Sequence, residues 1–194
     1  MHISSISKKW IVGISVLVAL FIVWIVFLMP PFIEYMKISR LIEEGVAIKS
    51  FSDQDKEIVG EFFDFSYDDT VMFSKLQYES GFRDSCIEFY AEVSTKDNET
   101  IKGELLANYE RDNSTSVING LDSLIVDGYP CVGSYTHKNN LNYSVFVFEG
   151  ENKKIYVYYS YRTGTEISDY VKQQVKQGNY EKPTRTSSSS SVTN

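Results

Sequence analysis

Apolar and polar residues follow three successive patterns along this chain, and the first is an unbroken apolar run. Residues 10–29 contain Trp, Ile, Val, Leu, Phe and a few small residues, bounded by Lys8 and Lys9 before the run and by Pro30 and Pro31 after it. A helix over this run is about 30 Å long at about 1.5 Å per residue, which matches the hydrocarbon core of a bilayer. The run therefore predicts one membrane-spanning helix.

We expect this span to be retained as a signal anchor rather than cleaved. A cleavable signal peptide has an apolar region of about 7–15 residues followed by small residues, whereas this run ends on Leu28, Met29 and two prolines. Basic residues are nearly balanced at its two ends, but a short basic tail before a first span normally stays in the cytoplasm. The prediction is a cytoplasmic tail at residues 1–9, a transmembrane helix at 10–29 and the main domain outside the cell membrane.

The second pattern has the period of an amphipathic helix. It predicts a juxtamembrane helix within residues 30–50, and then a short helix that begins near Ser52 or Asp53. The apolar stripe of that second helix would be Ile58, Val59, Phe62 and Phe63. A strand over residues 57–65 is the alternative.

From residue 70 onward the apolar residues recur with period two, which predicts antiparallel strands joined by short turns. The predicted strands are 71–78, 86–95, 100–110, 121–126, 131–137, 141–149 and 154–162. A helix capped by Thr165 and ending before Gly178 follows them. The predicted fold class is α+β: a transmembrane helix, then a mostly antiparallel β-meander with flanking helices. Residues 51–178 form the extracytoplasmic domain, and 179–194 a disordered Ser-rich tail.

Alternation within these strands separates a core face from a candidate partner-binding face. Ile87, Phe89, Ala91 and Val93 point to the core, so Glu88, Tyr90 and Glu92 point away from it. The last two strands are apolar on both faces, so a helix or a partner must cover the second one. The predicted partner-binding residues are Glu88, Tyr90, Glu92, Glu104, Asn108, Phe146, Phe148, Tyr156 and Tyr158.

Charge and aromatic content narrow the kind of partner. The formal net charge is −7, which disfavours nucleic acid as a ligand and leaves a cationic partner as the complementary choice. The chain has 14 Tyr and 12 Phe, and Tyr is enriched where proteins bind one another. The combination favours protein binding, although Tyr is also common in half-buried strands.

The sequence marks no catalytic set, so we predict neither an enzyme nor a cofactor. The two histidines and two cysteines have no zinc or redox spacing. Cys86 and Cys131 could form one disulfide if the domain is exported, or stay as small buried thiols. His137 falls in a predicted turn, and Asp64, Asp68 and Asp69 match no calcium loop, so we expect all four to be solvated.

The architecture from Trp10 to about Val175 resembles the TipC family of membrane-anchored immunity proteins of Gram-positive bacteria. The resemblance implies a β-rich domain outside the membrane that neutralises an exported toxin by occluding it. No residue pattern is shared, so it carries no site residues. A bitopic component of a secretion or conjugation machine is the alternative function, and a membrane-tethered hydrolase is a third.

Overall fold

The computed structural model describes residues 5–80, 85–113 and 124–183 of the chain. It divides the chain into two compact units, Met1–Leu41 and Ile42–Asn194. The first unit is helical, and the second contains the whole of the sheet.

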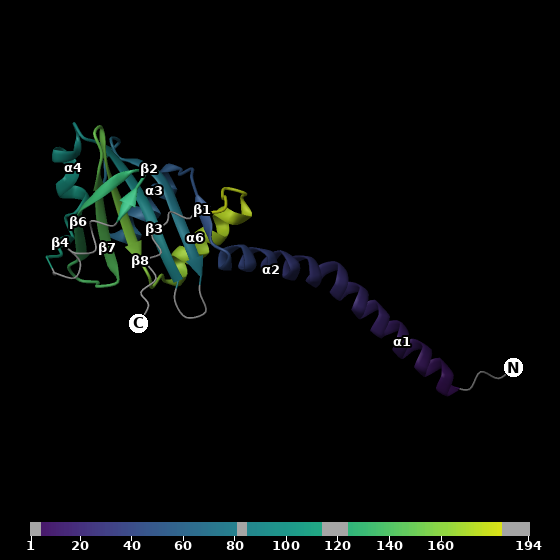
Figure 1. Ribbon diagram of the computed structural model, residues 1–194. Helices are drawn as coiled ribbons and strands as arrows, with labels where there is room; N and C mark the ends of the chain where they lie inside the picture. Colours follow the sequence, from purple (N-terminus) through teal and green to yellow (C-terminus); the bar gives the residue numbers. More distant parts are fainter. Residues whose placement is uncertain (1–4, 81–84, 114–123, 184–194) are drawn as a thin grey trace. The chain divides into compact units, whose positions relative to one another are not determined.

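The first unit is built on one long apolar helix. It comprises α1 (Ser5–Val23), a π-helical segment η1 (Trp24–Leu28) and α2 (Met29–Glu43). The ribbon runs on from α1 into α2 and changes direction between them (Figure 1). Among the described residues, Val12–Glu43 is the one helix long and apolar enough to cross a membrane, and none of its most apolar stretch is buried. The predicted apolar helix is confirmed.

The second unit contains an eight-stranded sheet in which every pairing is antiparallel. In spatial order, its main path is β1 (Val46–Ile48), β2 (Met72–Ser80), β3 (Ser85–Ser94), β8 (Lys153–Ser160), β7 (Tyr143–Glu149), β6 (Tyr129–His137) and β4 (Tyr109–Arg111). The two-residue strand β5 (Ile125–Val126) pairs with the start of β6. With its flanking helices, this sheet confirms the α+β class.

Three helices pack on one side of the sheet, which we call the helix face: α3 (Asp53–Phe63), α4 (Asn98–Leu105) and α6 (Thr165–Lys176). The ring of Phe63 from α3 lies 5.5 Å from that of Tyr158 on β8, whose hydroxyl donates to the Leu105 carbonyl of α4 at 2.6 Å. Tyr78 of β2 and Ser168 of α6 share a hydrogen bond of 2.6 Å. Figure 1 shows α3 and α6 behind the same strands. The opposite side is called the open face below.

Aromatic rings form the centre of the core on the helix face. Phe65 stacks on Tyr158 with 4.4 Å between centroids, and Phe73 meets Phe89 edge-on at 4.7 Å. Each such ring contributes about 1.5–3 kcal/mol by burial, and ring pairs add about 0.5–1.5 kcal/mol. This core fixes the register of β2, β3 and β8.

Local signals set the ends of α3 and α6. Ser52 caps α3 and exchanges hydrogen bonds with Asp55 in a capping box, so the helix reading of this segment is correct and the strand reading is wrong. Gly178 follows α6 at φ +77°, a conformation that glycine adopts without strain. The N-cap of α6 is Gly164 rather than the predicted Thr165, which is the first helical residue.

The predicted strand at 100–110 is wrong. Residues 98–105 form α4, and only the three residues of β4 at 109–111 join the sheet. Ile101 and Leu105 are spaced by four, so they share one helix face as readily as they share one strand face. In the helix both side chains are buried.

The folded unit also extends past both predicted limits. Residues 46–48, which fall inside the predicted juxtamembrane helix, form β1 against β2. At the other end, Glu181 forms a two-way backbone bridge with Ala47, and the Asn179 amide donates to the Ser50 carbonyl at 2.8 Å. The first part of the predicted disordered tail is therefore ordered, while residues 184–194 lie outside the described part.

Candidate functional site

The open face is the surface on which five of the nine predicted partner-binding residues lie, three on β3 and two on β7. Glu88, Tyr90 and Glu92 of β3 alternate with core residues, and β3 pairs with β2 and β8. Side chains of paired residues point to the same side of a sheet. The open face therefore also carries Lys75, Gln77 and Glu79 of β2, Ile155, Val157 and Tyr159 of β8, and Phe146 and Phe148 of β7.

A hairpin covers the apolar half of this face. Tyr90, Cys131, Phe148, Ile155 and Val157 form a buried cluster, and Leu124, Val126, Tyr129 and Phe146 pack against it. Asp127 and Gly128 have φ of +51° and +83°, and positive φ at both central residues defines the two-residue hairpin turn that Asp-Gly favours. That turn folds β5 back onto β6. The hairpin therefore covers the apolar side chains of β7 and β8 on the open face, for which the sequence predicted a helix or a partner.

The other half of the open face is a polar strip, defined here by Lys75, Gln77, Glu79, Glu88 and Tyr159. Its centre is a hydrogen-bonded network in which Tyr90 donates to Glu88 at 2.9 Å. The Gln77 amide donates to Glu88 and to the Tyr90 hydroxyl, each at 3.3 Å. Because these bonds hold several side chains in one arrangement, the strip presents a defined acceptor surface at Glu88.

Carboxylates outnumber cations in and beside the strip. The carboxylates are those of Glu79, Glu88, Glu92, Asp127 and Glu181, and the cations are Lys49, Lys75 and Lys153. Lys153 pairs with Glu92 at 2.7 Å and lies 4.0 Å from Asp127, and its hydrogen bond to Glu92 raises its pKa. Burial lowers the pKa of Lys75, as does the nearby Lys49, against the attraction of Glu181, Glu88 and Asp127. The strip is therefore acidic in balance, as the whole chain is.

Tyr156 and Tyr158 do not belong to the partner-binding surface, contrary to the sequence prediction. They are 1% and 0% exposed and lie on the helix face, where the Tyr156 hydroxyl donates to Asn98. The register pairs Phe146 with Val157 and Val147 with Tyr156, so the two tyrosines share a face with the valines of β7. Phe148 is on the open face but only 4% exposed under the hairpin.

Glu104 and Asn108 are also absent from the open face, because the segment that carries them is not the predicted strand. Glu104 is exposed on α4. Asn108 donates to the Asp64 carbonyl at 3.1 Å and so joins the end of α3 to the chain after α4. Of the nine predicted residues, Glu88 and Glu92 remain the charged groups of the open face.

Cys86 and Cys131 are both free thiols. They lie on β3 and β6, with β8 and β7 between them, and Cys131 lies level with Glu92 rather than with Cys86. Three strand spacings alone separate them by about 14 Å, about twice the largest Cα separation that a disulfide spans. The disulfide that the sequence allowed is not formed.

His137 is buried, although the sequence predicted a solvated residue in a turn. It is 6% exposed, its Nε2 lies 3.0 Å from an Asp64 carboxylate oxygen, and its Nδ1 accepts from the Asn139 backbone N–H at 3.1 Å. Since Nδ1 accepts, Nε2 is the donor to Asp64. Both ring nitrogens are occupied, so the pair joins the end of α3 to β6 and leaves no nitrogen for a substrate proton.

The predicted acidic cluster is dispersed. Asp64 binds His137, whereas Asp68 accepts from the Thr70 backbone at 2.8 Å, and hydrogen bonds from the Thr70 side chain and backbone lower the pKa of Asp68. This is a local Asx turn. No group of three or more His, Cys, Asp or Glu residues that could hold a metal ion is present in residues 5–80, 85–113 and 124–183.

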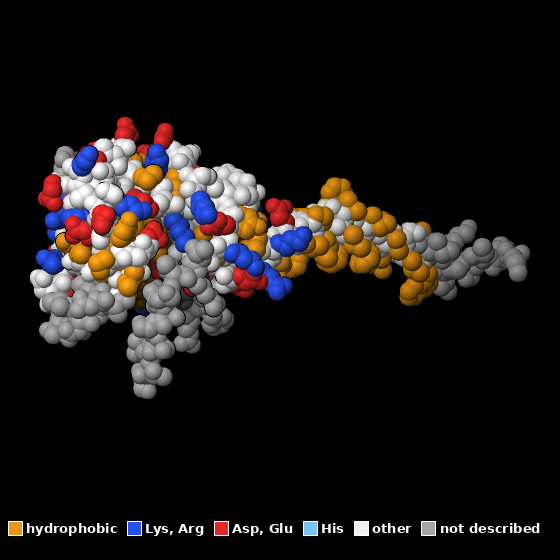
Figure 2. Space-filling model, turned by 45° about the horizontal axis from the view of Figure 1, so that its top comes forward, with side chains coloured by type: hydrophobic (Ala, Val, Ile, Leu, Met, Phe, Trp, Pro, Cys, Tyr) orange, Lys and Arg blue, Asp and Glu red, His pale blue; other side chains and the backbone are white. Residues whose placement is uncertain are grey.

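The exposed apolar helix is the second candidate functional surface. Figure 2 shows hydrophobic side chains along most of its described length, with charged side chains gathered at one end. Large side chains such as Leu17, Phe21 and Phe27 are 67%, 58% and 69% exposed. An apolar surface of this extent on a soluble monomer would be unusual.

Comparison with known proteins supplies no relative. The chain matches no family model, no curated protein and no solved structure. The apolar helix and the open face are therefore the two features of this chain that bear on function.

Proposed function

We propose that this chain is a membrane-anchored protein-binding module. In this proposal the apolar helix crosses the bilayer with its N-terminus in the cytoplasm, and the sheet unit outside binds a partner through the polar strip. The observation that carries the proposal is the apolar stretch within Val12–Glu43, no residue of which is buried. Removing such a surface from water stabilises a protein by about 25 cal/mol per Å², and a bilayer is the environment that its length fits.

The polar strip supports the second half of the proposal. The half-buried Glu88 carboxylate, fixed in a hydrogen-bonded network, and the exposed Glu79 favour a cationic surface. Opposite charges steer association and select the partner. A partner surface rich in Lys or Arg would also extend the pattern already present where Lys153 bridges Glu92 and Asp127.

The narrower proposal is that the partner is an exported toxin and that the chain is its immunity protein. This follows from the resemblance in outline to membrane-anchored immunity proteins. An anchor would hold the inhibitor where an incoming toxin acts, so that location becomes part of the inhibition.

Membrane fractionation tests the anchor. We expect the full chain to remain with membranes after an alkaline carbonate wash, and Leu17→Arg with Leu20→Arg to release it, because each central Arg costs about 2.5–3.5 kcal/mol on insertion. The matched control is the same pair of changes at Tyr35 and Ser39, beyond the prolines, where retention should persist. Release of the unchanged chain by carbonate would refute the anchor.

Charge reversal tests the strip. Glu79 is exposed on the open face and Glu104 is exposed on α4, on the helix face. Glu79→Lys should weaken partner capture by the detergent-solubilised chain several-fold, while Glu104→Lys, with the same change in net charge, should not. Equal effects would show that net charge rather than the strip governs binding.

The identity of the captured proteins separates the functions. One soluble, exported partner bound tightly supports immunity, and several membrane subunits support the alternative of a secretion or conjugation component. Capture of neither class from the native host would refute both.

A further inference from the structure

The two adjacent prolines in the apolar helix leave one backbone carbonyl without any helical donor. An α-helix pairs the carbonyl of residue 26 with the N–H of residue 30, and a π-helix pairs it with that of residue 31. Both positions are proline, and proline has no N–H. The Met29 N–H is already used, since it donates to the Trp24 carbonyl. The Val26 carbonyl is therefore left unpaired by the helix.

An unpaired carbonyl is tolerated in water or among headgroups but is strongly disfavoured in hydrocarbon, which offers no donor. The hydrocarbon region must therefore end close to Val26, rather than at Met29 where the apolar run ends. From Trp10 to Val26 the helix rises about 24 Å. Local thinning of the bilayer and snorkelling of the flanking lysines accommodate such a short span.

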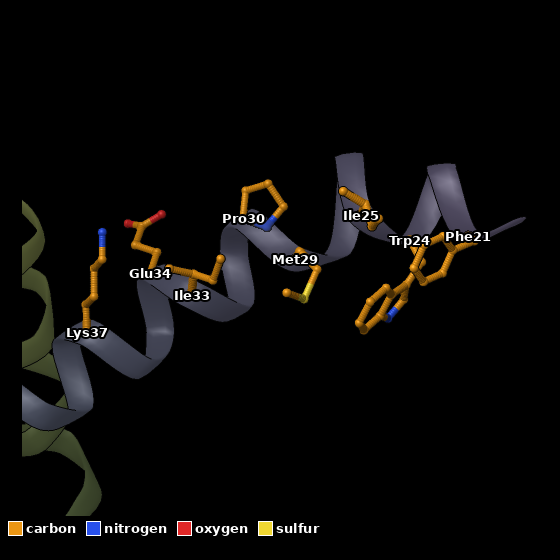
Figure 3. Close-up of a pocket in the computed structure, with 8 residues that line it drawn as sticks. All are labelled: Phe21, Trp24, Ile25, Met29, Pro30, Ile33, Glu34 and Lys37. Atoms are coloured by element: carbon orange, nitrogen blue, oxygen red, sulfur yellow. The ribbon is translucent and has the colours of Figure 1, made fainter. Parts of the chain in front are cut away.

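The side chains around this point match an interface. Trp24 lies half a turn before Val26, and tryptophan is enriched at membrane–water interfaces. Beyond it, Met29, Phe32, Ile33 and Met36 recur at helical spacing, and the last three are 58%, 44% and 53% exposed. Figure 3 shows the charged side chains of Glu34 and Lys37 pointing to one side of the same helix.

Resting on the proposed anchor, we propose that the Pro30–Pro31 pair ends the membrane-embedded helix at Val26 and directs residues 29–36 into the lipid headgroup region. In this arrangement Trp24 anchors the outer interface, and the Met29, Phe32, Ile33 and Met36 stripe contacts the boundary between headgroups and acyl chains. The occupant of this apolar stripe is lipid. The geometry is that of an interfacial amphipathic helix continuing from a span.

Tryptophan fluorescence gives a direct measure of this depth, because the chain has two tryptophans. Trp10→Phe leaves Trp24 as the only one. The full chain would be reconstituted in phosphatidylcholine vesicles that contain lipids with a quencher either near the headgroup or deep in the acyl chain. We expect the shallow quencher to quench Trp24 more strongly. Adding Pro30→Ala and Pro31→Ala restores donors to the Val26 and Phe27 carbonyls. The hydrocarbon boundary can then move from Val26 to Met29, and Trp24 should lie deeper by about 4.5 Å.

Trp24→Phe provides the control, since Trp10 should stay shallow with or without the proline substitutions. Stronger quenching of Trp24 by the deep quencher in the proline-containing chain would overturn this inference and leave the anchor intact. A Trp24 that stays shallow after both prolines are replaced would also overturn it, because the prolines would then not set the boundary. Failure of the unchanged chain to float with the vesicles would refute the anchor itself.

Discussion

Replacing Gly150 by Ala tests whether the Tyr129 ring seals the apolar half of the open face. A Cβ at position 150 would lie 2.4 Å from Cζ and 2.5 Å from Cε1 of the Tyr129 ring, well inside contact distance. The backbone at Gly150 does not require positive φ, so alanine is otherwise acceptable there and the whole penalty comes from the ring. Overpacking of this kind costs about 1–3 kcal/mol.

The companion change is Tyr129→Ala, which removes a half-buried aromatic side chain and should cost about 0.8–1.5 kcal/mol, half the value for a fully buried one. In that background Gly150→Ala should be neutral, or stabilise by about 0.4–1 kcal/mol through the unfolded chain. The double variant should therefore be more stable than the sum of the single changes predicts, by about 1–3 kcal/mol.

Urea unfolding of the four chains in detergent would give these free energies of unfolding. Hydrogen exchange adds a local reading, because the Cys131 N–H donates to the Leu124 carbonyl at 3.1 Å and should exchange faster when Tyr129 is displaced. Additive free energies, or a Gly150→Ala chain as stable as the parent, would refute the contact and with it the covering of the open face by the hairpin.

Three further predictions concern the helix face. Asp64 has φ +54° and accepts a hydrogen bond from His137, so Asp64→Asn, which keeps an acceptor, should be nearly neutral. Asp64→Gly should lower the free energy of unfolding by about 1–3 kcal/mol because the bond is lost, and Asp64→Ala by about 1 kcal/mol more because of backbone strain. An Ala variant as stable as the Gly variant would refute the strain. The Ser160 hydroxyl is buried without a partner among the described residues, so Ser160→Ala should raise the free energy of unfolding by about 1 kcal/mol, and a loss of stability would reveal a missed bond. Burial holds the pKa of Tyr158 well above its ordinary value and also raises that of Tyr156, so both stay protonated when folded. In the unfolded chain both tyrosines lose their protons above about pH 10. The free energy of unfolding should therefore be constant below that pH and fall above it. Urea midpoints that do not change between pH 9 and about 11 would contradict the burial of the two hydroxyls.

Short-range signals in the sequence predicted their elements well. Ser52 caps the start of α3 and Gly178 follows α6. A turn was expected at residues 127–130, and the structure narrows it to the two residues Asp127 and Gly128. Each of these depends on the conformation of one to four residues, so the sequence contains the necessary information. The apolar helix was also predictable, because it depends only on the length of the apolar run and on its lack of charged residues.

The errors arose where distant parts of the chain choose between equivalent local patterns. Ile101 and Leu105 fit one face of a helix or of a strand, and the buried partners Tyr156 and Tyr158 select the helix. The placement of Tyr156 and Tyr158 depends on the register between β7 and β8, and a shift of one residue exchanges the faces. No pattern near residue 137 predicts the pairing of His137 with Asp64, because 73 positions separate the two residues.

The position of β1 has a mechanical consequence for an anchored protein. β1 is the first strand after α2, it is three residues long, and it lies at the edge of the sheet. Under the proposed anchoring, tension between a bound partner and the bilayer enters the domain through this strand. β1 is held by its ladder with β2 and by the bridge from Ala47 to Glu181, so under load this edge yields first. The core between β3 and β8 would stay folded, while the detached β1 residues would lengthen the connection between the domain and the membrane helix.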